Sequence, residues 1–180
     1  MKASIILSTY NRPQALLTVL EALKLQTIQD FEVCIADDGS TKDTQQIIEN
    51  FQQNSAFPIL HAWQDDRGFR AASARNNAVR ISSGDYLLFL DGDCIPRPNW
   101  IQQHLALSEK HAFVAGNRVL LDETLSHAIE THRIPFTDLF GLNVLRHKEH
   151  INRLIPLLKI PLGSMRKLKP TSWAKVRTCN

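Results

Sequence analysis

The sequence predicts an α/β fold built on a doubly wound, mostly parallel sheet. Apolar segments of strand length alternate with segments whose apolar residues recur at helical spacing, and the connections between them are short. Three of the predicted strands end in polar residues, as is typical where ligands bind beyond the carboxyl ends of parallel strands. A composition of 43% hydrophobic and 22% charged residues is sufficient for one domain with a substantial core.

The elements follow from the pattern of apolar residues and turn residues. We expect a strand at 3–9, a helix at 13–25, a strand at 31–36, a helix through 47–51, a strand at 57–63, a helix at 71–81, a strand at 86–90, a helix at 100–107 and a strand at 113–121. Asn11 is predicted to cap the first helix, and Ser40 or Thr41 the second. Residues 125–145 are expected to be mainly helical.

The stretch around which the fold is organised is the apolar run Tyr86–Leu90 and the acidic turn after it. The run does not alternate with polar residues, which predicts a strand buried on both faces. Asp91 and Asp93 follow, separated by Gly92. Two such close carboxylates repel each other unless a cation lies between them, and a hard divalent ion that bridges to phosphates fits. The alternative is an ordinary tight turn, because Asp-Gly is common in hairpins.

Two other strand ends are expected to converge on the same crevice. Ser8, Thr9 and Tyr10 end the first strand, and Asp38 ends the second. Asp38 can accept a hydrogen bond from a base N–H or a ribose hydroxyl, and Tyr10 offers an aromatic face to a base. Arg75 either approaches phosphates or is an ordinary solvated helix charge. The set is suited to binding a nucleotide diphosphate.

Other classes of protein are disfavoured. Neither a Walker loop nor Gly-x-Gly-x-x-Gly occurs, so ATPase and dinucleotide-binding functions have little support. Cys34, Cys94 and Cys179 are too scattered for a disulfide framework or a zinc site and fit a reducing compartment. We expect no signal peptide, no membrane-spanning helix and no nucleic-acid partner. Residues 1–124 carry 11 Lys and Arg against 15 Asp and Glu, and residues 125–180 carry 10 against 3.

Taken together, four stretches resemble the family 2 glycosyltransferases. They are residues 4–11 (Ser-Ile-Ile-Leu-Ser-Thr-Tyr-Asn), residues 26–41 leading to Asp-Asp-Gly-Ser-Thr, residues 74–78 (Ala-Arg-Asn-Asn-Ala) and residues 84–93 ending in Asp-Gly-Asp. The resemblance covers residues 3 to about 120. It implies a GT-A fold and an inverting transferase that uses a nucleotide-diphospho-sugar, most naturally a UDP-sugar, with Mg²⁺ or Mn²⁺.

The resemblance also implies roles for individual residues. Ser8, Tyr10 and Asp38 would hold the base and the ribose. Asp91 would lie near the ribose and the sugar, and Asp93 would bind the metal that bridges the diphosphate, so that Asp91 and Asp93 form the catalytic pair. The metal would act as a Lewis acid on the leaving nucleotide diphosphate.

An inverting transferase also needs a general base, which in the family is an acid well downstream of the Asp-x-Asp motif. None of the acids after Asp93 lies in that setting: Glu109, Asp122, Glu123, Glu130, Asp138 and Glu149. The last residues, 176–180, resemble the start of the segment that precedes this acid in relatives. We therefore expect a chain cut short at its C-terminus, with its general base unknown or absent.

The expected organisation is one domain in two parts. Residues 1–124 would bind the nucleotide sugar, and residues 125–180 would form a basic, partly helical, incomplete acceptor side. The expected function is sugar transfer to a glycan or lipid-linked acceptor in cell-surface polysaccharide synthesis. The alternatives are a non-catalytic nucleotide-sugar-binding fragment and a nucleotidylyltransferase, and the latter is disfavoured because its Gly-rich first loop is missing at residues 9–12.

The expected location is cytoplasmic and peripheral to the inner face of the membrane. A basic cluster would meet anionic lipid, unless it is only a solvated face; it comprises Arg166, Lys167, Lys169, Lys175 and Arg177. A homo-oligomer is a further option, because the core beneath the C-terminal end is expected to be incomplete.

Overall fold

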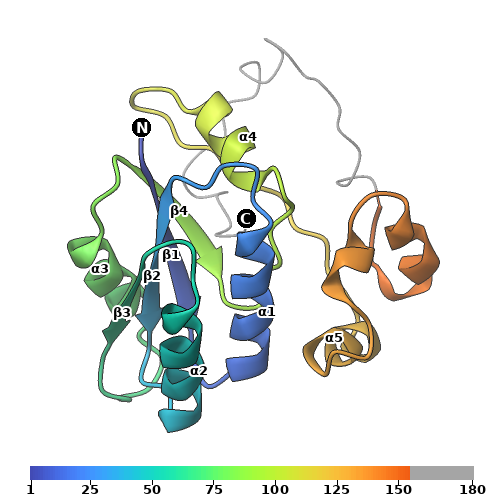
Figure 1. Cartoon of the computed structure of the whole chain (residues 1–180), viewed down its shortest axis with the longest axis horizontal. Coiled ribbons are helices and arrows are strands. Elements are labelled where there is room, and N and C mark those ends of the chain that lie inside the picture. Colours follow the sequence, from blue (N-terminus) through green and yellow to red (C-terminus); the bar gives the residue numbers. More distant parts are fainter. Residues whose placement is uncertain (155–180) are drawn as a thin grey trace. The chain divides into compact units, whose positions relative to one another are not determined.

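A computed structural model describes residues 1–154, and a four-stranded parallel sheet forms the centre of their first part (Figure 1). The chain divides into two compact units, Met1–Val114 and Ala115–Asn180. The elements of the first unit are β1 (Ala3–Thr9), α1 (Pro13–Lys24), β2 (Phe31–Asp37), α2 (Lys42–Gln53), β3 (Ile59–Trp63), α3 (Ala71–Ile81), β4 (Tyr86–Asp91) and α4 (Trp100–Leu107). These bounds confirm the predicted strands and helices up to residue 107.

The sheet has the strand order β3-β2-β1-β4, with β1 between β2 and β4. In register, Ala3 lies beside Phe31 on one side and beside Tyr86 on the other, so the three strands begin at the same level. Every residue of β2 is buried, as expected for a parallel strand covered by helices on both faces. Three strands that begin and run together also end together, which places their polar ends at one edge.

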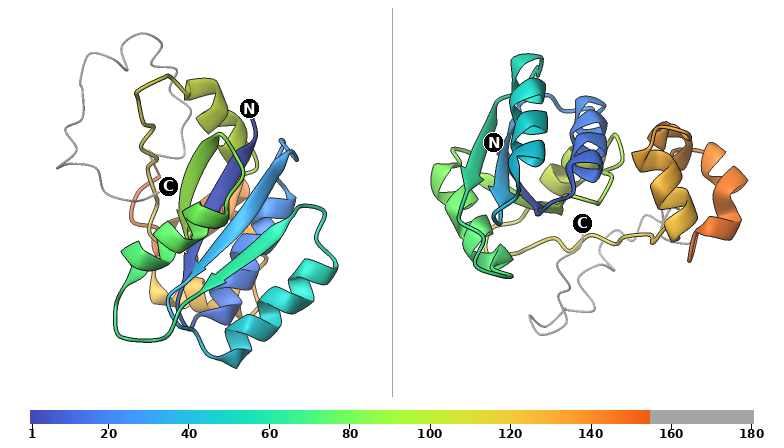
Figure 2. Two further views of the ribbon diagram at one scale, coloured as in Figure 1. Left: turned by 90° about the vertical axis from the view of Figure 1, so that its left-hand side faces the viewer. Right: turned by 90° about the horizontal axis from the view of Figure 1, so that it is seen from below.

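The helices cover the two faces of the sheet, which confirms the doubly wound fold (Figures 1 and 2). On one face, Leu16 and Leu20 of α1 pack with Ile5 and Leu7 of β1, joined by Ile48 of α2. On the other face α3 is the covering helix, and its small residues allow it to lie close to the sheet. The second cluster comprises Ile6, Cys34, Ala36, Ala74 and Ala78. Burial raises the pKa of the Cys34 thiol to about 11.

Strand β4 differs from its expected burial. Leu88 and Leu90 are buried, but Phe89 is 40% exposed, so the prediction of a strand buried on both faces was wrong. Within the described residues β4 lies at the edge of the sheet, and α3 packs over β1, β2 and β3. The uninterrupted apolar run of β4 therefore does not mean equal cover on both of its faces.

The second unit is described as far as residue 154. It contains one α-helix and two 3₁₀-helices: α5 (Glu123–Glu130), η1 (Phe136–Leu139) and η2 (Asn143–His150). This confirms the helical character expected there. The strand predicted at 113–121 was wrong, because in the described chain only Leu121 of this stretch pairs, in an isolated antiparallel bridge with Ile151. An apolar run does not become a strand without a neighbour to share its backbone hydrogen bonds.

At the N-terminal end of the sheet a buried carboxylate joins three segments of the chain. Ser4 Oγ donates to Glu32 at 2.6 Å, Ser83 Oγ at 2.8 Å and Lys2 Nζ at 3.0 Å. Burial raises the pKa of Glu32, but these hydrogen bonds outweigh it and lower the pKa to about 2. Gly84 lies so close to β1 that a Cβ added there would be 2.5 Å from Ser4 Oγ. We call these five residues the Glu32 cluster.

Candidate functional site

The C-terminal ends of β1, β2 and β4 bring together the polar residues that the sequence pointed to. Thr9 lies beside Asp37 in the β1–β2 register, and Ser8 lies beside Asp91 in the β1–β4 register. The backbone N–H of Asp38 donates to Thr9 O at 3.1 Å, and that of Gly92 donates to Ser8 O at 2.7 Å. We call this end of the sheet the donor edge.

Asp91 is held by two partners at the donor edge. Arg75 Nη2 lies 2.7 Å from Asp91 Oδ1, and Ser8 Oγ donates to the same oxygen at 3.1 Å. Arg75 Nη2 also donates to Ser8 Oγ at 3.1 Å, which closes a triangle. Arg75 therefore orients a carboxylate in this structure, and its expected approach to phosphates stays a prediction.

Asp93 is more open than Asp91. Its side chain is 52% exposed, and Arg12 Nη1 lies 3.5 Å from its Oδ2. Cys94 Sγ, which is partly exposed, lies 3.6 Å from Asp93 Oδ1. The Gly92 backbone is pressed against β1, since an added Cβ would be 2.5 Å from Ser8 O. Glycine is needed here because the turn and β1 approach each other so closely.

The donor set at the end of β4 fits the divalent metal that the family resemblance implies. No group of three or more His, Cys, Asp or Glu residues is placed to hold a metal in residues 1–154. At the end of β4, Asp91 and Asp93 provide two carboxylates, and the Asp93 side chain is half exposed. Mg²⁺ is commonly bound by one or two carboxylates together with water and substrate phosphates, so the two residues match that mode of binding.

Asp38 is almost fully enclosed, with 5% of its surface exposed. Gln64 Nε2 donates to its Oδ1 at 2.6 Å, and the backbone N–H of Arg70 donates to its Oδ2 at 2.7 Å. Gln64 follows β3, and nothing in the local sequence pattern marked it as part of the site. Gln64 is identified as part of the site only by its hydrogen bond to Asp38, which lies 26 residues earlier in the sequence.

Both carboxylate oxygens of Asp37, the neighbour of Asp38, have partners within the protein. Its Oδ1 accepts a hydrogen bond from the backbone N–H of Ser40 at 2.8 Å, and its Oδ2 lies 2.9 Å from His61 Nε2. Burial raises the pKa of Asp37, but the hydrogen bonds to His61 and Ser40 outweigh this and lower it. Asp37 thereby fixes the turn that presents Asp38.

Asn11 joins the loops that follow β1 and β2. Its backbone N–H donates to Ser40 Oγ at 3.0 Å, and its Oδ1 accepts from the backbone N–H of Thr41 at 2.9 Å. Its φ of 49° lies in the left-handed region that asparagine tolerates. The prediction of Asn11 as a helix cap was wrong: Arg12 occupies the N-cap position of α1, and its side chain makes no capping bond.

Tyr10 is about half exposed, whereas Thr9 is buried. Tyr10 is 48% exposed, and its hydroxyl donates to Asp66 Oδ2 at 2.9 Å, which raises the Tyr10 pKa. The packing of its half-exposed ring against a base stays a prediction. Thr9 is buried, and its Oγ1 has no hydrogen-bond partner among residues 1–154. Its side chain lies against Gly92, where a Cβ would come within 3.5 Å of Thr9 Cβ.

The acids downstream of Asp93 have varied local settings. Asp122 Oδ1 accepts from the backbone N–H of Leu125 and so caps α5, and its Oδ2 lies 2.7 Å from His150 Nδ1. Asp138 Oδ2 lies 3.7 Å from His147 Nε2. These two acids have structural partners, and no general base is identified among the described residues.

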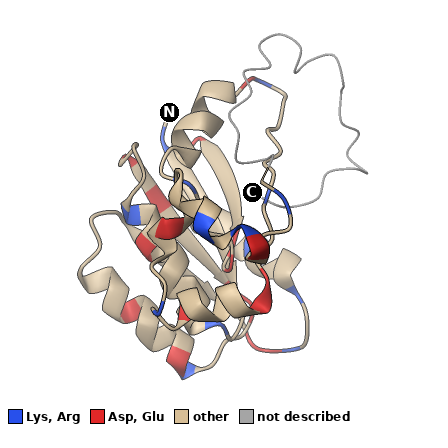
Figure 3. Ribbon diagram, turned by 90° about the vertical axis from the view of Figure 1, so that its right-hand side faces the viewer, with Lys and Arg blue, Asp and Glu red and all other residues tan. Residues whose placement is uncertain are grey.

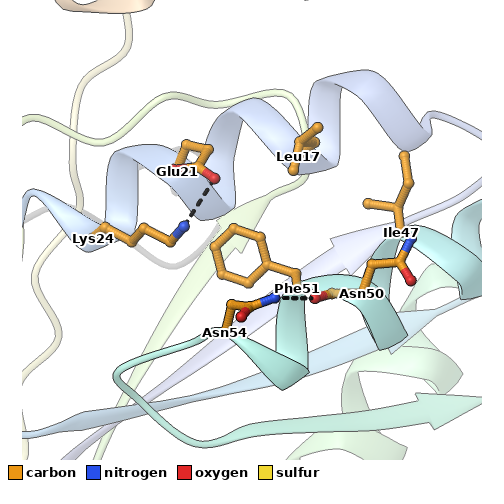
Figure 4. A pocket seen from close by; sticks show the side chains of 7 residues that line it. All are labelled: Leu17, Glu21, Lys24, Ile47, Asn50, Phe51 and Asn54. Carbon is orange, nitrogen blue, oxygen red and sulfur yellow. Dashed lines mark hydrogen bonds and ion pairs between the residues drawn. The ribbon is translucent and has the colours of Figure 1, made fainter.

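Two further observations concern the surface of the described chain. A hollow of about 250 Å³ lies between the C-terminal halves of α1 and α2 (Figure 4). Phe51 forms part of its wall, with Lys24 Nζ 4.3 Å from the ring centre and 2.9 Å from Glu21 Oε1. None of the donor-edge residues lines this hollow. Among residues 1–154, none of the helices combines the length and the apolar character needed to cross a membrane.

The sequence is similar to several curated glycosyltransferases. It is 38% identical over 120 residues to validoxylamine A glucosyltransferase of Streptomyces hygroscopicus subsp. jinggangensis, which is 66% of this chain and 27% of that protein. It is 36% identical over 122 residues to hyaluronan synthase of Pasteurella multocida, which is 66% of this chain and 12% of the synthase. The chain thus corresponds to about a quarter or less of the length of these two relatives.

Solved structures of S. aureus TarS are also similar to this chain. S. aureus TarS in complex with UDP-GlcNAc matches with a TM-score of 0.50 and 29% sequence identity, over 59% of this chain and 30% of that one. A structure of residues 1–349 of S. aureus TarS matches with a TM-score of 0.51 at 20% identity, over 85% of this chain and 57% of that one, which shows the shared GT-A fold. The sequence profile of Glycosyl transferase family 2 matches residues 4–166. The chain therefore belongs to glycosyltransferase family 2.

Proposed function

We propose that this chain binds a UDP-sugar and divalent metal and serves an inverting transfer to a glycan or lipid-linked acceptor in surface polysaccharide synthesis. The observation that carries the proposal is the meeting of Asp38, Asp91 and Asp93 at one edge of the sheet. The similarity to TarS, whose structure holds UDP-GlcNAc, supports a UDP-sugar. The similarity to hyaluronan synthase supports a glycan acceptor.

In the proposed mechanism, different residues of the donor edge bind different parts of the nucleotide sugar. Asp38 accepts a hydrogen bond from the base, and the exposed face of Tyr10 lies against it. Ser8 and Asp91, tied together by Arg75, take the ribose and the sugar. Asp93 turns its exposed carboxylate to the diphosphate side. A bound Mg²⁺ or Mn²⁺ would stabilise the negative charge of the departing diphosphate.

The reaction itself replaces one bond at the anomeric carbon with another. The bond to the diphosphate oxygen breaks, the acceptor oxygen bonds from the opposite face, and the acceptor proton passes to a general base. Asp122 and Asp138 are engaged with neighbouring histidines. This engagement favours a second candidate function, which is nucleotide-sugar binding without transfer. A transfer assay with an extract of natural acceptors separates the two, because turnover by this chain excludes the second.

The decisive experiment measures UDP affinity by calorimetry with and without Mn²⁺. Asp93→Ala is expected to abolish the Mn²⁺-dependent gain in affinity while the protein stays folded. Asp38→Ala is expected to cost roughly 1–3 kcal/mol of binding, the range for losing a charged hydrogen-bond acceptor. Asp85→Ala is the matched control, since Asp85 is an exposed acid at the opposite end of β4. Equal UDP affinity of the native chain with and without Mn²⁺ would refute the metal-dependent proposal.

The setting of the enzyme is also part of the proposal. Residues 1–154 carry 15 Lys and Arg against 18 Asp and Glu, and both signs are spread along the ribbon (Figure 3). Residues 155–180 add six Lys and Arg and no acid. The basic cluster expected to meet anionic lipid lies outside the described residues, so membrane contact stays a prediction. Vesicle co-sedimentation that rises with anionic lipid content would support it.

We further propose a cytoplasmic location and a division of labour along the chain. The free thiols Cys34 and Cys94 in the described part support a reducing compartment. Residues 1–124 are proposed to bind the donor and residues 125–180 to face the acceptor, as one domain. Self-association stays a prediction, and sedimentation of the purified chain tests it.

A further inference from the structure

Gln64 is the centre of a hydrogen-bonded chain that reaches Asp38 from α3. Its Nε2 donates to Asp38 Oδ1 at 2.6 Å. Its Oε1 accepts from Asn77 Nδ2 at 3.0 Å and from Ser73 Oγ at 2.9 Å. The backbone N–H of Gln64 donates to Asp37 O at 3.2 Å, which anchors the residue to the end of β2.

The donor and acceptor of each hydrogen bond in this series are fixed by its first and last members, Arg80 and Asp38. Arg80 Nη1 donates to Asn77 Oδ1 at 2.6 Å, and a guanidinium can only donate. Asn77 must therefore turn its amide nitrogen to Gln64, and Gln64 must turn its own amide nitrogen to Asp38. An ionised carboxylate can only accept, so the relay Arg80–Asn77–Gln64–Asp38 has one consistent polarity. Hydrogen bonds aligned in this way strengthen one another.

The relay arises from helical spacing. Ser73, Asn77 and Arg80 stand four and three residues apart in α3, which places them on one face of the helix. That helix packs on β1, β2 and β3 through Ala74 and Ala78. Rigid packing of α3 thus fixes the donors that orient Gln64, and Gln64 transmits that order to Asp38.

We propose that Gln64 is a positioning residue that makes the donor edge select uracil over cytosine, an inference that rests on the proposed function. With one oxygen bound by Gln64 and the other by the Arg70 N–H, the Asp38 carboxylate is fixed in place. Each oxygen keeps a second lone pair, which can only accept. Uracil presents an N–H donor at its N3 position, whereas cytosine presents a lone pair there. A carboxylate held in one orientation accepts from the first and repels the second.

The test compares UDP and CDP affinities by calorimetry in the presence of Mn²⁺. Gln64→Met keeps the length of the side chain and removes its donor. We expect it to weaken UDP binding about tenfold and CDP binding less than twofold, so that the UDP/CDP affinity ratio falls. A purely structural role would weaken both nucleotides equally. Gln46→Met is the matched control, because Gln46 is exposed on α2 and bonds only its own helix neighbour Asn50 among the contacts described.

A second variant covers the case in which Gln64→Met fails to fold. Asn77→Asp preserves shape and can still accept from Arg80, but it replaces the donor that faces Gln64 Oε1 with an acceptor. It is expected to turn the Gln64 amide and to lower the same ratio about tenfold. An unchanged ratio in the folded variants overturns the inference while leaving the proposed function standing. A native chain that binds no UDP overturns both, and one that binds UDP and CDP equally overturns the inference.

Discussion

At the N-terminal end of the sheet the Glu32 carboxylate is 4% exposed, whereas at the C-terminal end the Asp93 carboxylate is 52% exposed. Both ends use a glycine that lies against β1, Gly84 before β4 and Gly92 after it. In the Glu32 cluster, donors from Lys2, Ser4 and Ser83 surround the carboxylate. The same strands therefore end in a closed network on one side and in an open one on the other. The closed network ties three segments of the chain together, and the open end is the one to which the proposed function assigns the ligand.

The largest expected effect is on stability at the closed end. Glu32→Ala leaves the Ser4 hydroxyl and the Ser83 N–H without their acceptor and is expected to cost roughly 2–4 kcal/mol of unfolding free energy, because each unsatisfied donor costs about 1–3 kcal/mol. Urea denaturation measures this loss. Glu49→Ala, which removes an exposed glutamate of α2, is the control and should change stability by less than about 0.5 kcal/mol. If folded Glu32→Ala protein also lost UDP affinity, the two ends of the sheet would be coupled.

The pH dependence of stability sharpens the same contrast. The folded pKa of Glu32 is lowered from 4.5 to about 2, so its contribution is fully present above pH 4.5 and is lost as the pH falls toward 2. The shift corresponds to ~3 kcal/mol. The lowered pKa of Asp37 acts in the same direction. Urea denaturation at several pH values between 2 and 4.5 gives the unfolding free energy as a function of pH. This dependence should be weaker for Glu32→Gln than for the native chain, and an equal dependence in both would contradict the assignment.

The two glycines form a matched pair for the next test. Gly84→Ala and Gly92→Ala each place a Cβ 2.5 Å from an atom of β1 and are expected to cost about 1–3 kcal/mol of stability. Only Gly92→Ala should also weaken Mn²⁺-dependent UDP binding, because it moves Asp91 and Asp93. Thermal denaturation and calorimetry measure the two properties. Equal loss of UDP affinity in both variants would remove the distinction between the ends.

The smallest effect concerns the exposed ion pair at the open end. Arg12→Gln removes a surface ion pair and should change stability by less than about 1 kcal/mol. It also removes a positive charge 3.5 Å from Asp93, so Mn²⁺ affinity without nucleotide should rise about two- to threefold, as read by electron paramagnetic resonance. Arg67→Gln breaks the more exposed pair with Asp65, whose residues lie away from Asp93 in the sequence, and serves as the control. A fall in Mn²⁺ affinity would mean that Arg12 supports the metal site.

Much of the first unit could be predicted from sequence because its signals are local. Apolar runs bounded by turns gave β1 and β4, and the polar residues after each strand gave Asp38, Asp91 and Asp93. Parallel strands in register then carry these residues to one edge without further information.

The remainder depends on contacts between distant residues. Gln64 and Glu32 each look like ordinary polar residues, and their roles arise from partners 26 and 51 residues away in Asp38 and Ser83. The exposure of Phe89 depends on which helix covers β4, and the failed strand at 113–121 depends on the lack of an adjacent strand in the described chain. Periodicity reports which residues are apolar, but not which neighbours they meet.

The unlike surroundings of Cys34 and Cys94 give the donor edge a built-in attachment point for a reporter. Cys34 is enclosed, and its pKa near 11 keeps the thiol protonated and slow to react with maleimides. Cys94 is partly exposed and follows Asp93 directly. With Cys179 replaced by serine, a fluorophore would attach selectively at Cys94. Paramagnetic Mn²⁺ arriving beside it would quench the emission, so occupancy of the site could be followed in real time without introducing a new cysteine.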